Sequence, residues 1–295
     1  MSFWRWIILA IVVIGAGIGI YMLTPVQGPA RDLTLVGDAG RGAQLIRIGG
    51  CITCHTDPKN RDAMLAGMQT AGLTTPFGTF YPPNITSSKS AGIGNWTLEM
   101  FSKAMSDGEG PDGHLYPAFP YDSYTLMSDQ EIADLYAALM QVPAVDAPSR
   151  PHDVGFPFNI RLAMAGWKHL FFTPQRYMSD TSRSEQWNRG RYLVFGPAHC
   201  VTCHSPRNAL GGIEKGRELS GNPGGGPGGK APSILKADLE EDFYDPASLV
   251  QVLVDGSTPD FDFLGGAMGE VIRDETSQWS EADRAAVAAY LFDLD

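Results

Sequence analysis

The sequence predicts an all-α protein in which one helical unit is used twice behind a single N-terminal membrane-spanning helix. Three observations predict this fold: an uncharged apolar run near the N-terminus, a segment repeated in both halves, and a helix-capping signal at the same place in each half. The chain has 295 residues, which is enough for about two domains. Its composition, 43% hydrophobic and 19% charged, is that of a chain that buries cores.

The first element is the apolar stretch from Phe3 to Leu23. About 20 apolar residues span a bilayer, whereas the apolar core of a signal peptide has about 7–15. Trp4 and Tyr21 lie near its two ends, where interfacial aromatic residues belong. Arg5 favours a cytoplasmic N-terminus. The alternative is a cleaved signal peptide with a poor cleavage site at residues 28–30, and in either case the rest of the chain is exported.

Both halves then repeat a short helix-compatible run with a glycine at the same place, Gly42 in one half and Gly190 in the other. Such a glycine allows one helix to cross another closely in a small fold. Each half ends in a helix with its own start signal, at Ser128 and at Ser280. The similar spacing of these signals predicts one fold used twice, in which the final helix packs on the first.

Each repeated run leads into the pentapeptide Cys-x-x-Cys-His, which is the attachment signature of c-type haem. The two thiols add across the haem vinyl groups, and the His binds iron axially. A redox dithiol does not require the His, and a zinc ribbon needs its two cysteine pairs close in sequence, whereas here they lie in different halves. The sequence therefore predicts two covalently attached haem c groups, which use all four cysteines. The predicted haem-binding residues are Cys51, Cys54 and His55 in the first half and Cys200, Cys203 and His204 in the second.

The predicted organisation has four parts. Residues 1–30 form the membrane anchor and a short linker, 31–142 the first haem domain, 143–186 a packed linker and 187–295 the second haem domain. The linker is rich in aromatic residues and proline, unlike a flexible Gly/Ser linker, so we expect it to pack against both domains. In the second haem domain, the Gly/Pro-rich tract 221–229 is predicted to be a surface loop.

Six further stretches carry a family resemblance: Thr75–Thr79, Pro83–Thr86, Gly92–Trp96, Leu115–Tyr121, Pro157–Arg161 and Gly266–Val271. From about Gly37 to the C-terminus, the chain resembles the membrane-anchored dihaem cytochromes c that are similar to the cytochrome subunits of bacterial periplasmic alcohol, aldehyde and gluconate dehydrogenases. The resemblance implies two tandem class I cytochrome c domains and a place in an electron-transfer chain. It implies no particular substrate.

The same resemblance implies which groups surround each iron. The carbonyl groups of Pro83 and Pro232 accept the second ring N–H of His55 and His204, which fixes each imidazole. Met268 lies in a glycine-rich loop before the last helix and is the expected sixth ligand of the second haem.

The sixth ligand of the first haem departs from the family pattern. Many relatives carry Met in the motif Leu-Tyr-Pro-Ala-Met-Pro, but this chain has Phe119 at that place, and phenylalanine cannot bind iron. Relatives that carry Phe at this place look as though they use a Met directly before the last helix as the sixth ligand. The matching residue in this chain is Met127. Met105, on a predicted helix where a core position is expected, and His114 are the alternatives.

Two six-coordinate haems leave no open iron, so we expect a carrier of single electrons that is not itself an enzyme. The expected donor is a periplasmic dehydrogenase or a quinol-oxidising complex, and the expected acceptor is a terminal oxidase or a soluble cytochrome. The expected location is the bacterial inner membrane, crossed once, with the haem domains in the periplasm. The net charge of −11 argues against a nucleic-acid partner and is compatible with a partner that presents a basic face.

Three other functions deserve comparison. A peroxidase-like dihaem enzyme would need the first haem open to substrate, and Phe119 makes that haem the candidate. A thiosulfate-oxidising dihaem enzyme would use a Cys as distal ligand, but all four cysteines are committed to thioether bonds. The cytochrome subunit of a stable dehydrogenase complex would share the chemistry of a free-standing carrier.

Overall fold

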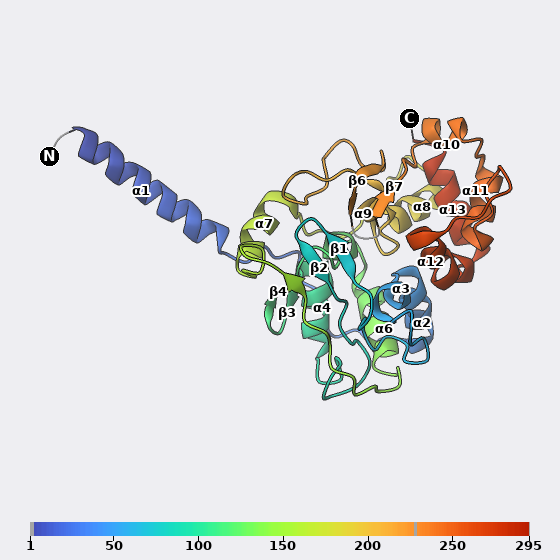
Figure 1. Ribbon diagram of the computed structural model, residues 1–295, viewed down its shortest axis with the longest axis horizontal. Helices are drawn as coiled ribbons and strands as arrows, with labels where there is room; N and C mark the ends of the chain where they lie inside the picture. Colours follow the sequence, from blue (N-terminus) through green and yellow to red (C-terminus); the bar gives the residue numbers. More distant parts are fainter. Residues whose placement is uncertain (1–2, 227–228, 295) are drawn as a thin grey trace.

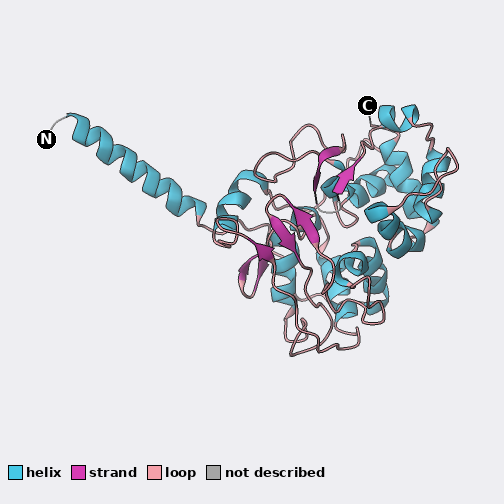
Figure 2. Ribbon diagram, in the orientation of Figure 1, coloured by secondary structure: helices cyan, strands magenta, loops and turns pink. Residues whose placement is uncertain are grey.

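The computed structural model of the protein describes residues 3–226 and 229–294. Met1, Ser2 and Asp295, at the ends of two predicted domains, and Pro227 and Gly228, in the predicted surface loop, lie outside the described residues. Helices dominate the structure, and three small antiparallel sheets lie among them (Figure 2).

The predicted anchor forms a single helix, α1 (Phe3–Met22), which projects away from the rest of the chain (Figure 1). Its side chains are almost all exposed. In the described part of the chain, α1 is the one helix whose length and apolar composition suffice to cross a membrane. At the C-terminal end of α1, Tyr21 and the following Thr24 contact His169 of helix α7 (Ala163–Phe171), with the Tyr21 and His169 ring centroids 4.5 Å apart.

The N-terminal half continues with five helices. They are α2 (Ala39–Ile48), α3 (Cys51–His55), α4 (Leu98–Asp107), α5 (Tyr121–Tyr124) and α6 (Asp129–Leu139). Helix α6 begins where the capping signal predicts. The Ser128 hydroxyl accepts a hydrogen bond from the Glu131 N–H, and the Glu131 carboxylate accepts one from the Ser128 N–H at 2.9 Å.

The C-terminal half has the same plan with additional short helices. Its helices are α8 (Glu185–Phe195), α9 (Cys200–His204), α10 (Lys236–Glu241), α11 (Pro246–Asp255), α12 (Gly266–Asp274), the 3₁₀ turn η1 (Thr276–Gln278) and α13 (Glu281–Leu291). Helix α13 starts after Ser280, whose hydroxyl accepts from the Asp283 N–H at 3.0 Å.

In both halves the first helix crosses the last one at a glycine. A side chain on Gly42 of α2 would collide with the backbone carbonyl of Asp134 on α6. A side chain on Gly190 of α8 would collide with the carbonyl of Ala286 on α13 in the same way. The structure therefore confirms the close crossing predicted from these glycines, and it sets α3 and α9 at equivalent places beside the two crossings.

The short strands were not predicted, so the all-α class is too narrow a description. Strands β1 (Leu73–Thr75), β2 (Gly78–Phe80) and β5 (Asp153–Val154) form one sheet in that order, β3 (Glu109–Gly110) pairs with β4 (Gly113–His114), and β6 (Asn222–Gly226) pairs with β7 (Gly229–Ala231). Strand β6 lies in the tract predicted to be a loop. These strands have two to five residues and no alternating apolar pattern, so the sequence carries no signal for them.

The linker between the halves packs against both, as its aromatic composition predicts. On the first half, the Phe172 ring meets the Tyr121 ring edge-on at 5.1 Å, and the buried Lys168 ammonium donates to the carbonyls of Asp107 and Gly108. On the second half, the Trp167 indole N–H donates to a loop carbonyl at residue 210, at 2.9 Å.

Candidate cofactor sites

Each Cys-x-x-Cys-His motif forms one short helix that follows a residue in the left-handed conformation. The residue is Gly50 before α3, with φ of 64°, and His199 before α9, with φ of 40°. Within each motif the two cysteines are three residues apart, so one helical turn brings both thiols to the same face. This is the spacing that two thioether bonds to one haem require.

The imidazoles that follow the cysteines are held by backbone carbonyls. The Nδ1 atom of His55 lies 2.7 Å from the carbonyl oxygen of Pro83, and Nδ1 of His204 lies 2.8 Å from that of Pro232. A ring that donates from Nδ1 presents the lone pair of Nε2, the form that binds a metal. Burial lowers the pKa of His55 to about 4 and also lowers the pKa of His204, so both rings are neutral at pH 7.

A cavity of about 600 Å³ adjoins the first motif. Its walls include Cys51, Cys54 and His55 on one side and apolar side chains of α4, α5 and α6 on the other. Arg150 and Arg161 also line it, and they offer positive charge to carboxylate groups. Thiols, a neutral imidazole and an apolar, partly basic wall fit a haem group with its two propionates.

In the second half, Met268 stands in the first turn of α12 and not in a loop as expected, because Gly265 and Gly266 start the helix earlier. The side chain is partly buried and packs against the same apolar core as Cys200. The structure thus brings the expected sixth ligand and the first cysteine of the second motif to one core.

In the first half the methionines are arranged differently. Met127 is 1% exposed and belongs to the apolar core that includes Leu135, but it is not among the described residues that line the 600 Å³ cavity. Met105 and Phe119 both line that cavity. His114 points elsewhere, with Nδ1 3.2 Å from the Lys168 ammonium.

The segments before the two motifs touch each other. His199 lines the first cavity together with Gly50, and a Cβ on Gly50 would lie 3.2 Å from the His199 Nε2 atom and 3.0 Å from a carboxylate oxygen of Glu275. Tyr124 contacts both segments: its hydroxyl donates to the carbonyl of Gly49 at 2.6 Å, and its ring meets that of His199 edge-on. Figure 1 shows α12, which ends before Glu275, beside α3. The segments that carry the two Cys-x-x-Cys-His motifs are therefore neighbours in space.

No protein-family model matches the sequence. Over 286 residues, however, the chain is 41% identical to a protein of Cereibacter sphaeroides named "Diheme cytochrome c-type", and the match covers 96% of this chain and 95% of that protein. This chain belongs to the dihaem c-type cytochromes.

The cytochrome also resembles parts of larger proteins. It is 38% identical over 255 residues to the fructose dehydrogenase cytochrome subunit of Gluconobacter japonicus, and the match covers 85% of this chain and 51% of that protein. It is 37% identical over 277 residues to one of the nicotinate dehydrogenase subunits of Pseudomonas putida, and the match covers 92% of this chain and 23% of that protein. The chain thus spans about half the length of the fructose dehydrogenase subunit and about a quarter of the length of the nicotinate dehydrogenase subunit.

The relatives confirm the predicted family and the two haem c groups of this cytochrome, and with them a role in electron transfer. The individual haem-binding residues stay predictions. Those of the first motif, with Pro83, lie around one cavity, whereas Met127 lies in the core beside it.

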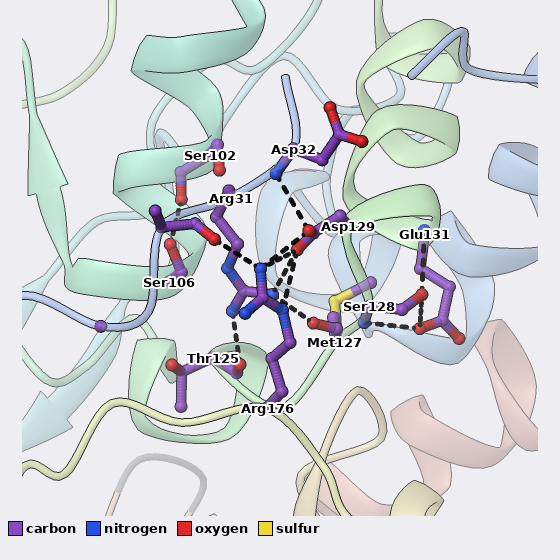
Figure 3. Close-up of polar contacts among 12 residues, drawn as sticks. Arg31, Asp32, Ser102, Ser106, Thr125, Met127, Ser128, Asp129, Glu131 and Arg176 are labelled. Carbon is purple, nitrogen blue, oxygen red and sulfur yellow. Dashed lines mark hydrogen bonds and ion pairs between the residues drawn. The ribbon is translucent and has the colours of Figure 1, made fainter. Parts of the chain in front are cut away.

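Sequence reasoning missed the ion-pair network that holds the loop before α6. Arg31 donates to the carbonyls of Thr125 and Met127, both at 2.6 Å, and also pairs with Asp129. Arg176 of the linker pairs with the same carboxylate at 2.8 Å (Figure 3). The partners are far apart in the sequence and follow no motif, so only the fold reveals them.

Proposed function

We propose that this dihaem cytochrome takes electrons from a periplasmic dehydrogenase and passes them to a terminal oxidase or a soluble cytochrome. Two tandem class I cytochrome c domains, residues 31–142 and 187–295, would each carry one haem. The observation that carries the proposal is the juxtaposition of the two motif segments at Gly50 and His199, which gives an electron a short route between haems. The dehydrogenase names of the relatives support the choice of donor.

When bound, haem c supplies reversible one-electron chemistry. The residues of this chain would act on the bound haem in four ways. The cysteines hold the group, the carbonyls of Pro83 and Pro232 orient His55 and His204, and the apolar walls exclude water. The sixth ligands set the potentials, and a thioether raises a potential.

We assign Met268 to the second haem and Met127 to the first. Met127 directly precedes Ser128, the cap of α6, and Trp279 holds the matching place before Ser280, the cap of α13, so the two halves would take their ligands from different positions. Met105 is the alternative for the first haem, and its place in the cavity wall supports it.

We further infer that α1 anchors the cytochrome in the bacterial inner membrane with both haem domains in the periplasm. The 20 residues of α1 match the thickness of a bilayer core, and aromatic residues lie near both ends. The contact of Tyr21 and Thr24 with α7 would hold the linker at the membrane surface.

Copurification tests the proposed donor. Full-length tagged cytochrome, extracted from its own membranes in mild detergent, should bring down a large dehydrogenase subunit, and the substrate of that dehydrogenase should reduce both haems. Reduction by a quinol-oxidising complex alone, with no dehydrogenase bound, would contradict the proposal.

A second candidate function is a peroxidase-like enzyme with the first haem open. The observation that favours it is the presence of Phe119 in the cavity wall, at the place where the family motif carries Met. Turnover of hydrogen peroxide by the purified cytochrome would support this candidate, and its absence, with both haems low spin, would exclude it.

A further inference from the structure

A carboxyl group is buried where the two haem-binding segments meet. Glu275 follows α12 in the second half, is 3% exposed, and reaches the turn before the first motif. A Cβ on Gly50, the residue before Cys51, would lie 3.0 Å from the Glu275 Oε1 atom. The charge of Glu275 acts on Cys51 and Cys54 of one motif and on Cys200 of the other. This carboxyl group therefore stands between both sets of thioether positions.

In the part of the chain that the structure describes, no ion pair within 4.0 Å joins Glu275 to a Lys, Arg or His side chain. The nearby guanidinium groups of Arg61 and Arg273 both pair with Asp274 instead, each at 2.6 Å. A buried carboxylate without a cationic partner is costly, and such a group binds a proton more readily than an exposed one.

The proton affinity of Glu275 follows from this environment. The pKa of Glu275 is raised to about 8, chiefly by burial and further by the charge of Asp274, against a smaller lowering by the Thr53 hydroxyl. The group thus changes charge close to physiological pH. Oxidised haem, with ferric iron in a dianionic porphyrin, carries one more positive charge than reduced haem, and that charge stabilises a neighbouring carboxylate.

Two other titratable groups at the junction, His199 and Tyr124, do not change charge in this range. Burial lowers the pKa of His199 to about 4 and raises the pKa of Tyr124 well above its usual value, so both are neutral. Asp122 of α5 is partly buried, and the loss of hydration raises the pKa of its carboxyl more than the charge of Arg207 lowers it. Glu270 of α12, whose charge also acts on Cys54, is partly exposed.

We propose that Glu275 is a proton-binding site coupled to the oxidation state of the haems, so that its carboxylate takes up a proton from water when an electron arrives and releases it when the electron leaves. Ferric iron gains one electron from the redox partner and becomes ferrous, the carboxylate gains one proton, and no other bond changes. The inference rests on the proposed attachment of haem at both motifs. It makes the potentials of this cytochrome dependent on pH through one side chain.

Redox titrations of the full-length cytochrome test the inference, with Glu275→Gln beside the wild type and Glu270→Gln as the matched control on the preceding helix. In the wild type, the haem potentials should fall as the pH rises through about 8, because the carboxylate then stabilises ferric iron. Glu275→Gln should match the wild type at the acidic end and lie above it at the alkaline end. Glu270→Gln should keep the wild-type dependence on pH.

Infrared difference spectra detect the proton on the carboxyl group directly. Reduction of the wild type above pH 8 should produce a protonated carboxyl band, which Glu275→Gln should lack and Glu270→Gln should keep. Parallel pH curves for wild type and Glu275→Gln, or no such band in the wild type, would overturn the inference. Haem content per chain is measured alongside: fewer than two covalent haems in the wild type would refute the proposed attachment, whereas two haems without the band would refute only the role of Glu275.

Discussion

The imidazole rings of His55 and His204 illustrate how single contacts would prepare the two proposed haem sites. Each ring donates from Nδ1 to a proline carbonyl, and proline is suited to this place because it offers a carbonyl acceptor but no competing backbone N–H. Burial keeps both rings neutral, so Nε2 of each ring would bind iron in the proposed sites without loss of a proton.

The methionines give the sharpest prediction at the residue scale. We expect Met268→Leu to convert the second haem to high spin and leave the first unchanged, because leucine fills the space but supplies no sulfur. Met127→Leu should do the same for the first haem, while Met105→Leu should leave both low spin. Electron paramagnetic resonance of the oxidised proteins reports each spin state. A high-spin first haem in Met105→Leu, with Met127→Leu unchanged, would transfer the assignment to Met105.

At the scale of elements, the two helix crossings define the halves. Gly42→Ala should lower the free energy of unfolding by at least about 1–3 kcal/mol, because the added methyl group meets the Asp134 carbonyl with no room to move. Gly40→Ala is the matched control on α2, since its methyl group would meet only the exposed Asp38 side chain at 3.1 Å. Denaturant unfolding measures both. Equal stability of the two variants would contradict the proposed crossing.

The loop before α6 depends on the carboxylate of Asp129. Burial raises the pKa of Asp129, but hydrogen bonds from Arg176, Arg31 and the Asp32 N–H lower it more, so the net pKa is below its usual value. A lowered folded-state pKa stabilises the fold above the unfolded pKa of about 4, and this stability is lost as the pH falls through the folded value. We expect the unfolding free energy to fall with acid in this window.

Asp129→Asn should remove about 1–3 kcal/mol at neutral pH and flatten the acid dependence, because the amide accepts fewer charge-assisted bonds. Thermal unfolding at a series of pH values measures both effects. A variant that loses stability with acid as steeply as the wild type would show that another carboxylate is responsible.

At the scale of the whole molecule, the features that could be predicted from the sequence are those encoded by neighbouring residues. The motifs at Cys51 and Cys200, the caps at Ser128 and Ser280 and the apolar run of α1 each lie within a few neighbouring residues, and their positions follow from short-range rules. The short strands, the Arg31–Asp129 network and the position of Glu275 depend on partners from distant segments. Such contacts leave no periodic pattern, so the structure was needed to find them.

The overall charge leads to a prediction about partners. With a net charge of −11, we expect electron transfer to a basic partner to slow as ionic strength rises, because salt screens the attraction that steers the encounter. Stopped-flow reduction of a basic soluble cytochrome by the reduced protein measures the rate over a salt series. A rate that rises with salt would show that the docking face is not acidic.

The central claim is that both irons are six-coordinate and the protein only carries electrons. Near-infrared magnetic circular dichroism of the oxidised full-length cytochrome, with haem content checked on the same sample, reports the axial ligands of each iron. We expect two haems per chain and two His/Met signals. One His/Met haem beside a high-spin iron would contradict the account, leave the first haem open, and direct attention to peroxide chemistry there.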